Sequence, residues 1–422
     1  MANSSSIASL EQNQPSTGSG SATHHSSERD VETLNRRDDF QRNVWSVAGL
    51  PIDMATVADA VSEVEQAART SRRLTLVTPN INMLCNGITK PSARADILMH
   101  DFSVADGLPL VKIAQFLGAP ISSRCAGSDV FEGLQARSAP AGRQMKVFFF
   151  GGRDGAADAA AKALAERPGG FEPVGALNPG FGSLEELSAD HFIDEINQAN
   201  PDFIVVALGS ERGNAWIIRN QDRLTAPVIS HLGAVVDFTA GGIARAPKWM
   251  ARAGLEWAWR IKEEPSLWKR YWHDAVSLAK LMVTRIVPLK LIRQKSAGAP
   301  AEAELKITNR DVVVRLSGDL TVDHLGPVRD VFRQAASTGC PVILDMSKTG
   351  QIDAAFLGLV LMLEKAFVSA DGKAASARLT TAGLTSTARA IFRCHGLNFP
   401  EVELTHEHAS DEDLIAPLGQ TA

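Results

Sequence analysis

Short apolar stretches alternate with helical segments between Leu74 and Asp237, and several of these stretches end in polar turns. The stretches LTLV, KVFFF and DFIVV are predicted strands, and the alanine-rich stretch before Pro168 is a predicted helix. The stretch APVISHLGAVVDFTAG is predicted to supply another strand. Strands that alternate with helices indicate a mostly parallel sheet with helices on both faces. Ligands of such a sheet bind at the carboxyl ends of its strands, where the turns TPN, GGRDG and LGSERGN are expected.

The pattern changes between Arg245 and Lys295, where basic residues are interleaved with tryptophans. Helices are predicted here, with breaks near Pro265 and Pro288. Two interpretations are open. Either these helices lie at a membrane headgroup interface, which favours indole rings and cations, or they pack on the preceding domain with the tryptophans as core. The tryptophans concerned are Trp249, Trp257, Trp259, Trp268 and Trp272.

A second, smaller α/β domain is predicted towards the end of the chain, where three strands alternate with three helices. The start of the chain is rich in Ser, Gln and Gly and is expected to be disordered, and the acidic end is expected to be loose. The predicted segments are 1–40 (disordered), 41–244 (first α/β domain), 245–295 (helical appendage), 296–304 (linker), 305–405 (second α/β domain) and 406–422 (acidic tail).

Charge and cysteine usage exclude some classes of protein. A net charge of −5 argues against a nucleic-acid-binding protein, which needs a strongly basic face. The four cysteines form no C-x-x-C pair, which excludes the common zinc and redox spacings and suits a reducing cytoplasm. No secretory signal is recognised at the N-terminus, and no apolar run reaches the length of about 18 residues that a spanning helix needs. We therefore expect a soluble protein, or one held at a membrane surface.

Asp106 lies between a short apolar stretch and a longer one, which is an unusual place for a carboxylate. It is either the N-cap of the helix that follows or a group retained for chemistry. The second interpretation needs other polar groups at the same edge of the sheet. Thr78 and Asn80 follow one strand, although they could simply close a turn. Arg124, Ser128 and Asp129 precede the next helix, although Ser128 or Asp129 could simply cap it. Together they favour a site at this rim.

The turn GGRDG is a weak phosphate-binding signal. Gly151 and Gly152 follow a predicted strand and precede a predicted helix, so their backbone N–H groups could approach an anion. They would serve equally well as ordinary turn residues. The spacing matches neither G-x-G-x-x-G nor a P-loop, so neither dinucleotide binding nor ATP hydrolysis is supported.

A family resemblance is carried by motifs that occur in order along the chain: TPNINMLCN, VADGLPLV, RCAGSDVF, VFFFGG, LNPGFG, VVALGS, GAVVDFTAG and RAPKWMARAGLEWAWRIKEEPSLWKRY. Over roughly Trp45 to Tyr271 the chain resembles the WecG/TagA/CpsF glycosyltransferases, family 26. The resemblance implies a Rossmann-like, mostly parallel sheet with flanking helices and a helical Trp/Arg-rich appendage. It also implies inverting transfer of a sugar, usually from a UDP-sugar, to a polyprenyl-diphosphate-linked saccharide at the cytoplasmic membrane face, in cell-surface polysaccharide synthesis.

The resemblance gives roles to the polar groups at the rim. Asp106 matches the family's base, which takes the proton of the acceptor hydroxyl, and apolar flanks would raise its pKa towards a useful value. Thr78 and Asn80 match the TPN turn, and Arg124 matches an arginine near the leaving diphosphate. Asp129, Gly151, Gly152 and Asp237 lie within or beside the matching motifs and are further candidates for substrate binding.

The charge of the leaving diphosphate requires either a metal ion or cationic side chains. The only D-x-D sequence, at 411–413, lies in the acidic tail, well outside the matching motifs. Arginines bind phosphate oxygens in bidentate fashion, so we predict a metal-independent enzyme without a cofactor. The candidate arginines are Arg124, Arg245, Arg252 and Arg260. The last three could instead be solvated or lipid-facing charges.

One stretch departs from the family pattern. After VALGS the family usually has a proline-lysine-glutamine-glutamate run, and this chain has Glu211, Arg212, Gly213 and Asn214. The glutamine position, which is thought to help hold the substrate, is therefore glycine. Arg212 would retain the positive charge and Asn214 would replace part of the hydrogen bonding, so either a different donor sugar or weak activity follows.

The stretch VILDMSKTGQIDAAFLGLVLML resembles the central motif of STAS domains, over about Leu305 to Leu404. In that family a serine in the turn after the strand is phosphorylated, whereas here Asp353 is followed by Ala354, Ala355 and Phe356. Without a hydroxyl no phosphate ester can form there. The turn and the following helix are expected either to dock a partner protein or to be a stabilising appendage without a partner.

The prediction is therefore a cytoplasmic, peripherally membrane-associated inverting glycosyltransferase with a STAS-like domain. The alternative is a regulator or adaptor in which an inactive transferase domain supports STAS-mediated partner binding, and the altered stretch after VALGS is its best support. A nucleotide-dependent oxidoreductase is a weaker alternative, because the glycine fingerprint of dinucleotide binding is missing.

Overall fold

The structure is a computed structural model of the 422-residue chain. It describes residues 35–137, 143–242, 246–247, 249–250, 254–308, 311–368, 378–404 and 414–415. Residues 1–40 were expected to be disordered, and residues 1–34 of this segment lie outside the described residues. From residue 35 onwards the prediction is wrong, because Phe40 is buried and Asp39–Gln41 form a short 3-10 helix. Most of the acidic tail also lies outside the described residues.

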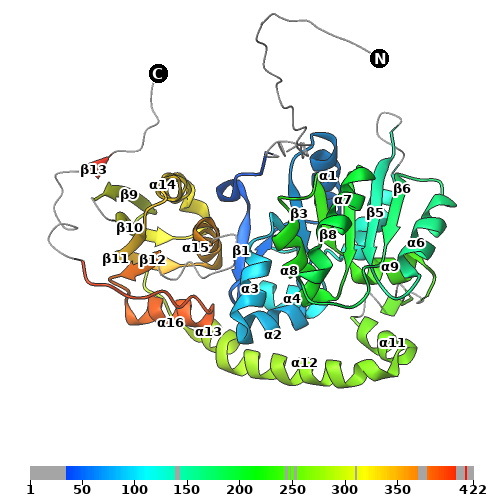
Figure 1. Ribbon diagram of the computed structural model, residues 1–422. Helices are drawn as coiled ribbons and strands as arrows, with labels where there is room; N and C mark the ends of the chain where they lie inside the picture. Colours follow the sequence, from blue (N-terminus) through cyan, green and yellow to red (C-terminus); the bar gives the residue numbers. More distant parts are fainter. Residues whose placement is uncertain are drawn as a thin grey trace, which may run out of the picture. The chain divides into compact units, whose positions relative to one another are not determined.

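A six-stranded sheet, with every pairing parallel, forms the centre of the first domain (Figure 1). The order of its strands is β4 (Phe102–Ser103), β3 (Leu74–Val77), β8 (Val228–His231), β7 (Phe203–Ala207), β5 (Met145–Gly151) and β6 (Phe171–Leu177). Successive residues of β5 face opposite cores: Val147 and Phe149 face one, Phe148 and Phe150 the other. The apolar run VFFF, residues 147–150, is therefore part of a strand that is buried on both faces, as is usual in parallel sheets.

Helices cover both faces of this sheet. The core on one face receives side chains from α1, α5, α6 and α9, and the core on the other face from α7 and α8. The helices are α1 (Val57–Arg69), α2 (Ile81–Thr89), α3 (Pro91–Leu98), α4 (Leu108–Phe116), α5 (Gly127–Ala136), α6 (Ala156–Ala165), α7 (Asp190–Gln198), α8 (Ser210–Asn220) and α9 (Gly233–Thr239). This arrangement confirms the predicted α/β class. The stretch APVISHLGAVVDFTAG is only half strand, because β8 ends at His231 and the rest forms α9.

The Trp-rich appendage is helical, with α11 (Glu256–Glu263), α12 (Trp268–Leu281), a π-helical segment (Met282–Ile286) and α13 (Val287–Leu291). Pro265 separates α11 from α12, as predicted. The predicted break at Pro288 is wrong, because the wider π turn precedes it and Pro288 falls in the first turn of α13, where a missing N–H is tolerated. No helix within the described part of the chain combines the length and the apolar character needed to cross a bilayer.

The tryptophans of the appendage are not core residues. Trp249, Trp257, Trp268 and Trp272 have exposed fractions between 48% and 65%, and no residue of α11 is buried. The interpretation of these side chains as the core of a packed helix pair is therefore wrong.

A five-stranded sheet forms the second domain, with the order β12 (Leu379–Ala382), β11 (Val342–Ile352), β10 (Val312–Leu320), β9 (Glu302–Ile307) and β13 (Leu414–Ile415). Its helices are α14 (Gly326–Ser337), α15 (Ala354–Phe367) and α16 (Ser386–Cys394). Strand β9 was not predicted, because it begins inside the expected linker and reads EAELKI, with charges at alternate positions. It pairs antiparallel with β10, whereas β11 pairs in parallel with both β10 and β12.

Helix α15 packs against β1 (Val44–Val47), which forms a hairpin with β2 (Leu50–Asp53) at the start of the first domain (Figure 1). The backbones approach so closely that any Cβ at Gly358 would overlap the carbonyl oxygen of Val44. Almost every residue of α15 is buried. The chain's own hairpin covers α15, so this helix is not free to dock a partner protein. A protein partner elsewhere on the STAS domain stays a prediction.

Candidate active site

A cavity of about 1590 Å³ opens at the carboxyl ends of β3, β4 and β8. Residues of α2, α4 and α5 also line it, and so do residues of α11 and α12, so the appendage is part of the site. The polar and aromatic residues that line it include Thr78, Asn80, Asp106, Arg124, Ser128, Asp129, Asn214, His231, Phe238, Glu256, Trp257, Trp259, Arg260 and Tyr271. Polar residues from several of the turns that the sequence analysis singled out thus line one cavity, and their roles stay a prediction.

Asp106 follows the short strand β4 and lines the cavity. Its backbone N–H donates to the carbonyl oxygen of Pro79 at 2.7 Å, which ties the end of β4 to the turn after β3. The N-cap of α4 is Gly107, with a φ of 95°, and no side chain caps that helix. Asp106 is therefore not a helix cap, and of its two interpretations only the chemical one remains as a proposal.

The electrostatic surroundings of Asp106 suit a base at neutral pH. Burial raises the pKa of Asp106 to about 7. The nearby Arg124 and Arg260 act to lower this pKa, and Glu256 and Asp129 act to raise it. A carboxyl group with this pKa is present in both protonation states near neutrality, which is the requirement for a proton acceptor that works there.

Arg124 forms the electropositive side of the site. Its Nη1 donates to Glu256 Oε2 at 2.6 Å, and its Nη2 lies 3.3 Å from Asp129 Oδ2. Arg124 precedes α5, a helix that begins at the cavity wall and carries no side-chain cap at Ala126. The positive end of a helix dipole and a guanidinium thus lie on the same wall, an arrangement that favours a phosphate.

Asn80 has a structural role in the turn after β3. Its side chain accepts a hydrogen bond from the N–H of Met83 at 3.1 Å and so caps α2. Thr78 lines the cavity next to Gly127, where any Cβ would lie 3.4 Å from the threonine hydroxyl. The turn therefore places Thr78 at the site, while the carboxamide oxygen of Asn80 holds the turn.

Two of the predicted phosphate-binding residues do not line the cavity. Gly151 ends β5 with a φ of 92°, and any Cβ there would lie 2.8 Å from the carbonyl oxygen of Ala207. The N–H of Gly152 donates to that same oxygen at 2.8 Å, so this N–H is not available to bind a phosphate. Close approach to β7 explains both glycines as turn residues.

The other predicted arginines differ in position. Arg260 on α11 lines the cavity, with its guanidinium 5.4 Å from the ring centroid of Phe238. Arg212 is exposed and is not among the cavity-lining residues. Arg245 and Arg252 lie outside the described residues. Asp237 is not a lining residue either; burial raises its pKa, while Arg153 and Arg260 act in the opposite direction.

Residues 45–290, more than half of the chain, match the model of the Glycosyl transferase WecG/TagA/CpsF family. The chain belongs to this family. Residues 303–403 match the Mlab, STAS domain model. Both resemblances seen in the sequence are therefore confirmed.

Relatives of this WecG/TagA/CpsF protein are named N-acetylglucosaminyldiphosphoundecaprenol N-acetyl-beta-D-mannosaminyltransferase. The one from Bacillus spizizenii is 28% identical over 196 residues, which cover 46% of this chain and 73% of the relative. The one from Staphylococcus aureus strain MW2 is 24% identical over 227 residues, 53% of this chain and 85% of the relative. The solved structure of the phosphorylated Bacillus cell fate determinant SpoIIAA is 24% identical, covers 25% of this chain and 95% of its own, and has a TM-score of 0.21.

The departure after VALGS has a structural counterpart in this WecG/TagA/CpsF member. Any Cβ at Gly213 would overlap the ring of His231, so the imidazole occupies the space next to this position. Burial lowers the pKa of His231 to about 4, which keeps the ring neutral. Asn214 lines the cavity, and its Nδ2 donates to the carbonyl oxygen of Ser210 at 2.8 Å. His231 was not predicted as a site residue, because it lies outside the altered stretch.

Glu256 and Tyr271, which the appendage contributes to the cavity, were also not predicted as site residues. Burial raises the pKa of Tyr271, so its phenol is present at neutral pH as a hydrogen-bond donor. Both residues lie inside the motif RAPKWMARAGLEWAWRIKEEPSLWKRY, of which only the tryptophans and arginines were considered as functional candidates.

Proposed function

We propose that the protein is an inverting glycosyltransferase that moves a sugar from a UDP-sugar to a polyprenyl-diphosphate-linked saccharide during cell-surface polysaccharide synthesis. The observation that carries this proposal is Asp106, a cavity-lining carboxylate with a pKa of about 7 that caps no helix. The family membership supports sugar transfer, and the names of the relatives support a lipid-linked acceptor.

The proposed reaction is a single displacement. The acceptor hydroxyl oxygen forms a bond to the anomeric carbon, and its proton passes to the Asp106 carboxylate. The bond between that carbon and the diphosphate oxygen breaks on the opposite face of the sugar, so the configuration inverts and UDP leaves with the electron pair. Arg124 and Arg260 neutralise the charge that develops on the diphosphate.

The carboxylates of Glu256 and Asp129 form ion pairs with the guanidinium of Arg124. An entering diphosphate competes with these carboxylates for the same guanidinium. Donor binding is therefore expected to loosen the pair between Arg124 and α11, and the N-terminal end of α5 supplies further stabilisation for the phosphates.

The test is sugar transfer by the full chain from a set of UDP-sugars to a polyprenyl-diphosphate-linked N-acetylglucosamine acceptor, with EDTA present. Formation of product with the opposite anomeric configuration supports the proposal, and unchanged product formation in EDTA supports metal-independent transfer. Calorimetry with the same donors separates the alternatives: a chain that binds no UDP-sugar would be an adaptor with an inactive site.

We expect the rate of transfer to rise with pH and to reach half of its plateau near pH 7, because only the ionised carboxylate of Asp106 accepts a proton. Below the pKa of about 7 the group is mostly protonated, so kcat/KM falls about tenfold for each pH unit. The measurement is a kcat/KM profile between about pH 5 and pH 9, which brackets that pKa. A profile that is flat through this range would argue against Asp106 as the base.

A continuous exposed apolar stripe supports attachment to a membrane surface. The stripe residues recur at helical spacing along α12, the π-helical segment and α13, with exposed fractions between 40% and 73%. They are Trp268, Trp272, Val276, Val283, Val287 and Leu291. Exposed basic residues accompany them, including Lys269, Lys280, Lys290 and Arg293. A helix with these two features lies in the interface of an anionic bilayer.

We expect the double substitution Val283→Glu and Leu291→Glu to lower binding to vesicles of phosphatidylcholine and phosphatidylglycerol by about tenfold or more. Both side chains belong to the stripe, and neither lines the cavity. Phe181→Glu is the matched control, because Phe181 is 97% exposed and lies outside the stripe. Vesicle sedimentation measures the partition coefficient, and equal losses in both proteins would contradict the assignment of the stripe.

A further inference from the structure

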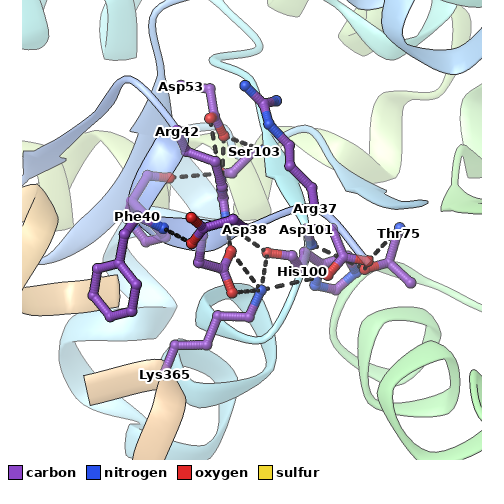
Figure 2. Close-up of polar contacts among 12 residues, drawn as sticks. Arg37, Asp38, Phe40, Arg42, Asp53, Thr75, His100, Asp101, Ser103 and Lys365 are labelled. Carbon is purple, nitrogen blue, oxygen red and sulfur yellow. Dashed lines mark hydrogen bonds and ion pairs between the residues drawn. The ribbon is translucent and has the colours of Figure 1, made fainter. Parts of the chain in front are cut away.

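The contact between α15 and the first domain contains a cluster of buried charges (Figure 2). The ammonium of Lys365 on α15 lies 2.9 Å from a carboxylate oxygen of Asp39, 3.1 Å from the carbonyl oxygen of His100 and 3.4 Å from Asp101 Oδ1. Arg42, which is fully buried, donates to both carboxylate oxygens of Asp53 at 2.7 and 3.2 Å. A helix of the second domain thus reaches charges that lie inside the first.

These charges surround β4, the strand that precedes Asp106. Asp101 Oδ2 accepts from the N–H and the hydroxyl of Thr75 on β3, each at 2.9 Å. The N–H of Ser103 donates to Asp53 Oδ2 at 2.8 Å. Strand β4 has only two residues, so these side chains supply much of what holds it in the sheet.

The protonation state of Asp101 agrees with this arrangement. Burial by itself would raise the pKa of Asp101, but the ammonium of Lys365 and the hydrogen bonds from Thr75 outweigh it, and the pKa lies below its usual value. The carboxylate is therefore charged and paired. Removing Lys365 would leave this buried charge without its cation, which is costly in a protein interior.

Other contacts across the same surface hold α15 in place. Arg94 on α3 forms a bidentate pair with Glu364, with N–O distances of 2.7 and 2.6 Å. Arg329 on α14 donates to the carbonyl oxygens of Phe40 and Arg42. The second domain is thus attached to the first by side chains from more than one helix.

We propose that the STAS domain is a built-in positioning unit of the transferase, in which Lys365 holds the strand that places Asp106 at the cavity. The proposal rests on the proposed function, because it gives Asp106 the role of base. Lys365 is a positioning residue: it touches Asp101 and the His100 carbonyl, and the effect reaches Asp106 through β4. A chain segment that is misplaced by about 1 Å near a reacting group can lower the rate by about 100-fold.

The test compares full-length Lys365→Met with Arg389→Met. The control removes an exposed pair between Arg389 and Glu401 within the STAS domain, away from the contact. The backbone amides of Asp101, Val104 and Asp106 donate to β3 and its turn. We expect the amides of 101–106 to exchange with deuterium at least about tenfold faster in Lys365→Met than in the wild type, and at the wild-type rate in Arg389→Met. We also expect kcat to fall about tenfold or more, with the donor KM within about twofold because the cavity arginines are untouched. Lys365→Arg, which retains the cation, should recover most of the kcat.

Unchanged exchange in Lys365→Met, or faster exchange with an unchanged kcat, would overturn the positioning role. If Lys365→Met does not fold, Asp39→Asn takes its place, since it removes one carboxylate partner of Lys365 from the more exposed side of the cluster. Wild-type exchange and kcat in that variant would also overturn the proposal. If no UDP-sugar is transferred by the unaltered chain, the proposed function fails, and the exchange experiment still tests the contact.

Discussion

Asp106→Asn is expected to lower kcat for sugar transfer by about 10²- to 10⁴-fold, which is the usual contribution of a positioned base. The amide has nearly the same shape as the carboxylate but cannot take the proton of the acceptor hydroxyl. Donor binding should be little changed, because Arg124 and Arg260 are retained. Initial rates at saturating donor measure the effect, and calorimetry measures donor affinity.

Asp96→Asn is the matched control for this substitution. Burial and the nearby Glu211 raise the pKa of Asp96 to about 6, so it too is a half-buried carboxyl group of the first domain. It does not line the large cavity, and its replacement should leave kcat within about twofold.

The stability of Asp106→Asn separates loss of chemistry from loss of fold. Because folding raises the pKa of Asp106 from 3.8 to about 7, the folded state loses stability as the pH rises between these two values, and the full loss remains above pH 7. The neutral amide removes that loss, so at about pH 8 the variant should unfold at the wild-type temperature or higher. A variant that keeps the full kcat would exclude Asp106 as the base.

Arg124→Gln is expected to lower kcat by about 10²- to 10³-fold, because a donor aimed at the developing negative charge is lost. Arg137→Gln is the matched control: Arg137 lies at the other end of α5, is paired with Glu65 and does not line the cavity. Steady-state kinetics with a good UDP-sugar donor give both values.

Glu256→Gln distinguishes charge neutralisation from a merely structural role of Arg124. Arg124 also holds α11 through Glu256, so a structural role would make the loss of either partner equally harmful. We expect kcat of Glu256→Gln to stay within about fivefold of the wild type, because the positive charge at the diphosphate is retained. Equal losses in the two variants would assign Arg124 to the support of α11 instead.

The sequence predicted the first sheet well because buried parallel strands have a strong local signal. The apolar run VFFF needs apolar neighbours on both faces of its strand, and Val147 and Phe148 do face different cores. The stretch APVISHLGAVVDFTAG does supply the predicted strand, β8, which ends at His231. The helix that follows it, α9, was not predicted, and it packs against α6.

The rim of polar residues was also predictable, since each one follows a strand or precedes a helix. The role of each residue at the rim was not predictable from the sequence. Asp106 was the possible cap in the sequence and Asn80 the possible turn residue, yet Asn80 caps α2 and Asp106 does not cap α4. The difference lies in the backbone at Gly107, whose φ of 95° starts α4 without help from a side chain.

The sequence by itself determined the α/β class, the family, the STAS resemblance and the carboxylate at the rim. Only the tertiary structure decided which distant side chains meet. Arg124 pairs with Glu256 across 132 positions, and Lys365 meets Asp101 across 264. Apolar periodicity reports which side of an element is buried, whereas pairs such as these depend on which surfaces come together, and no local pattern contains that information.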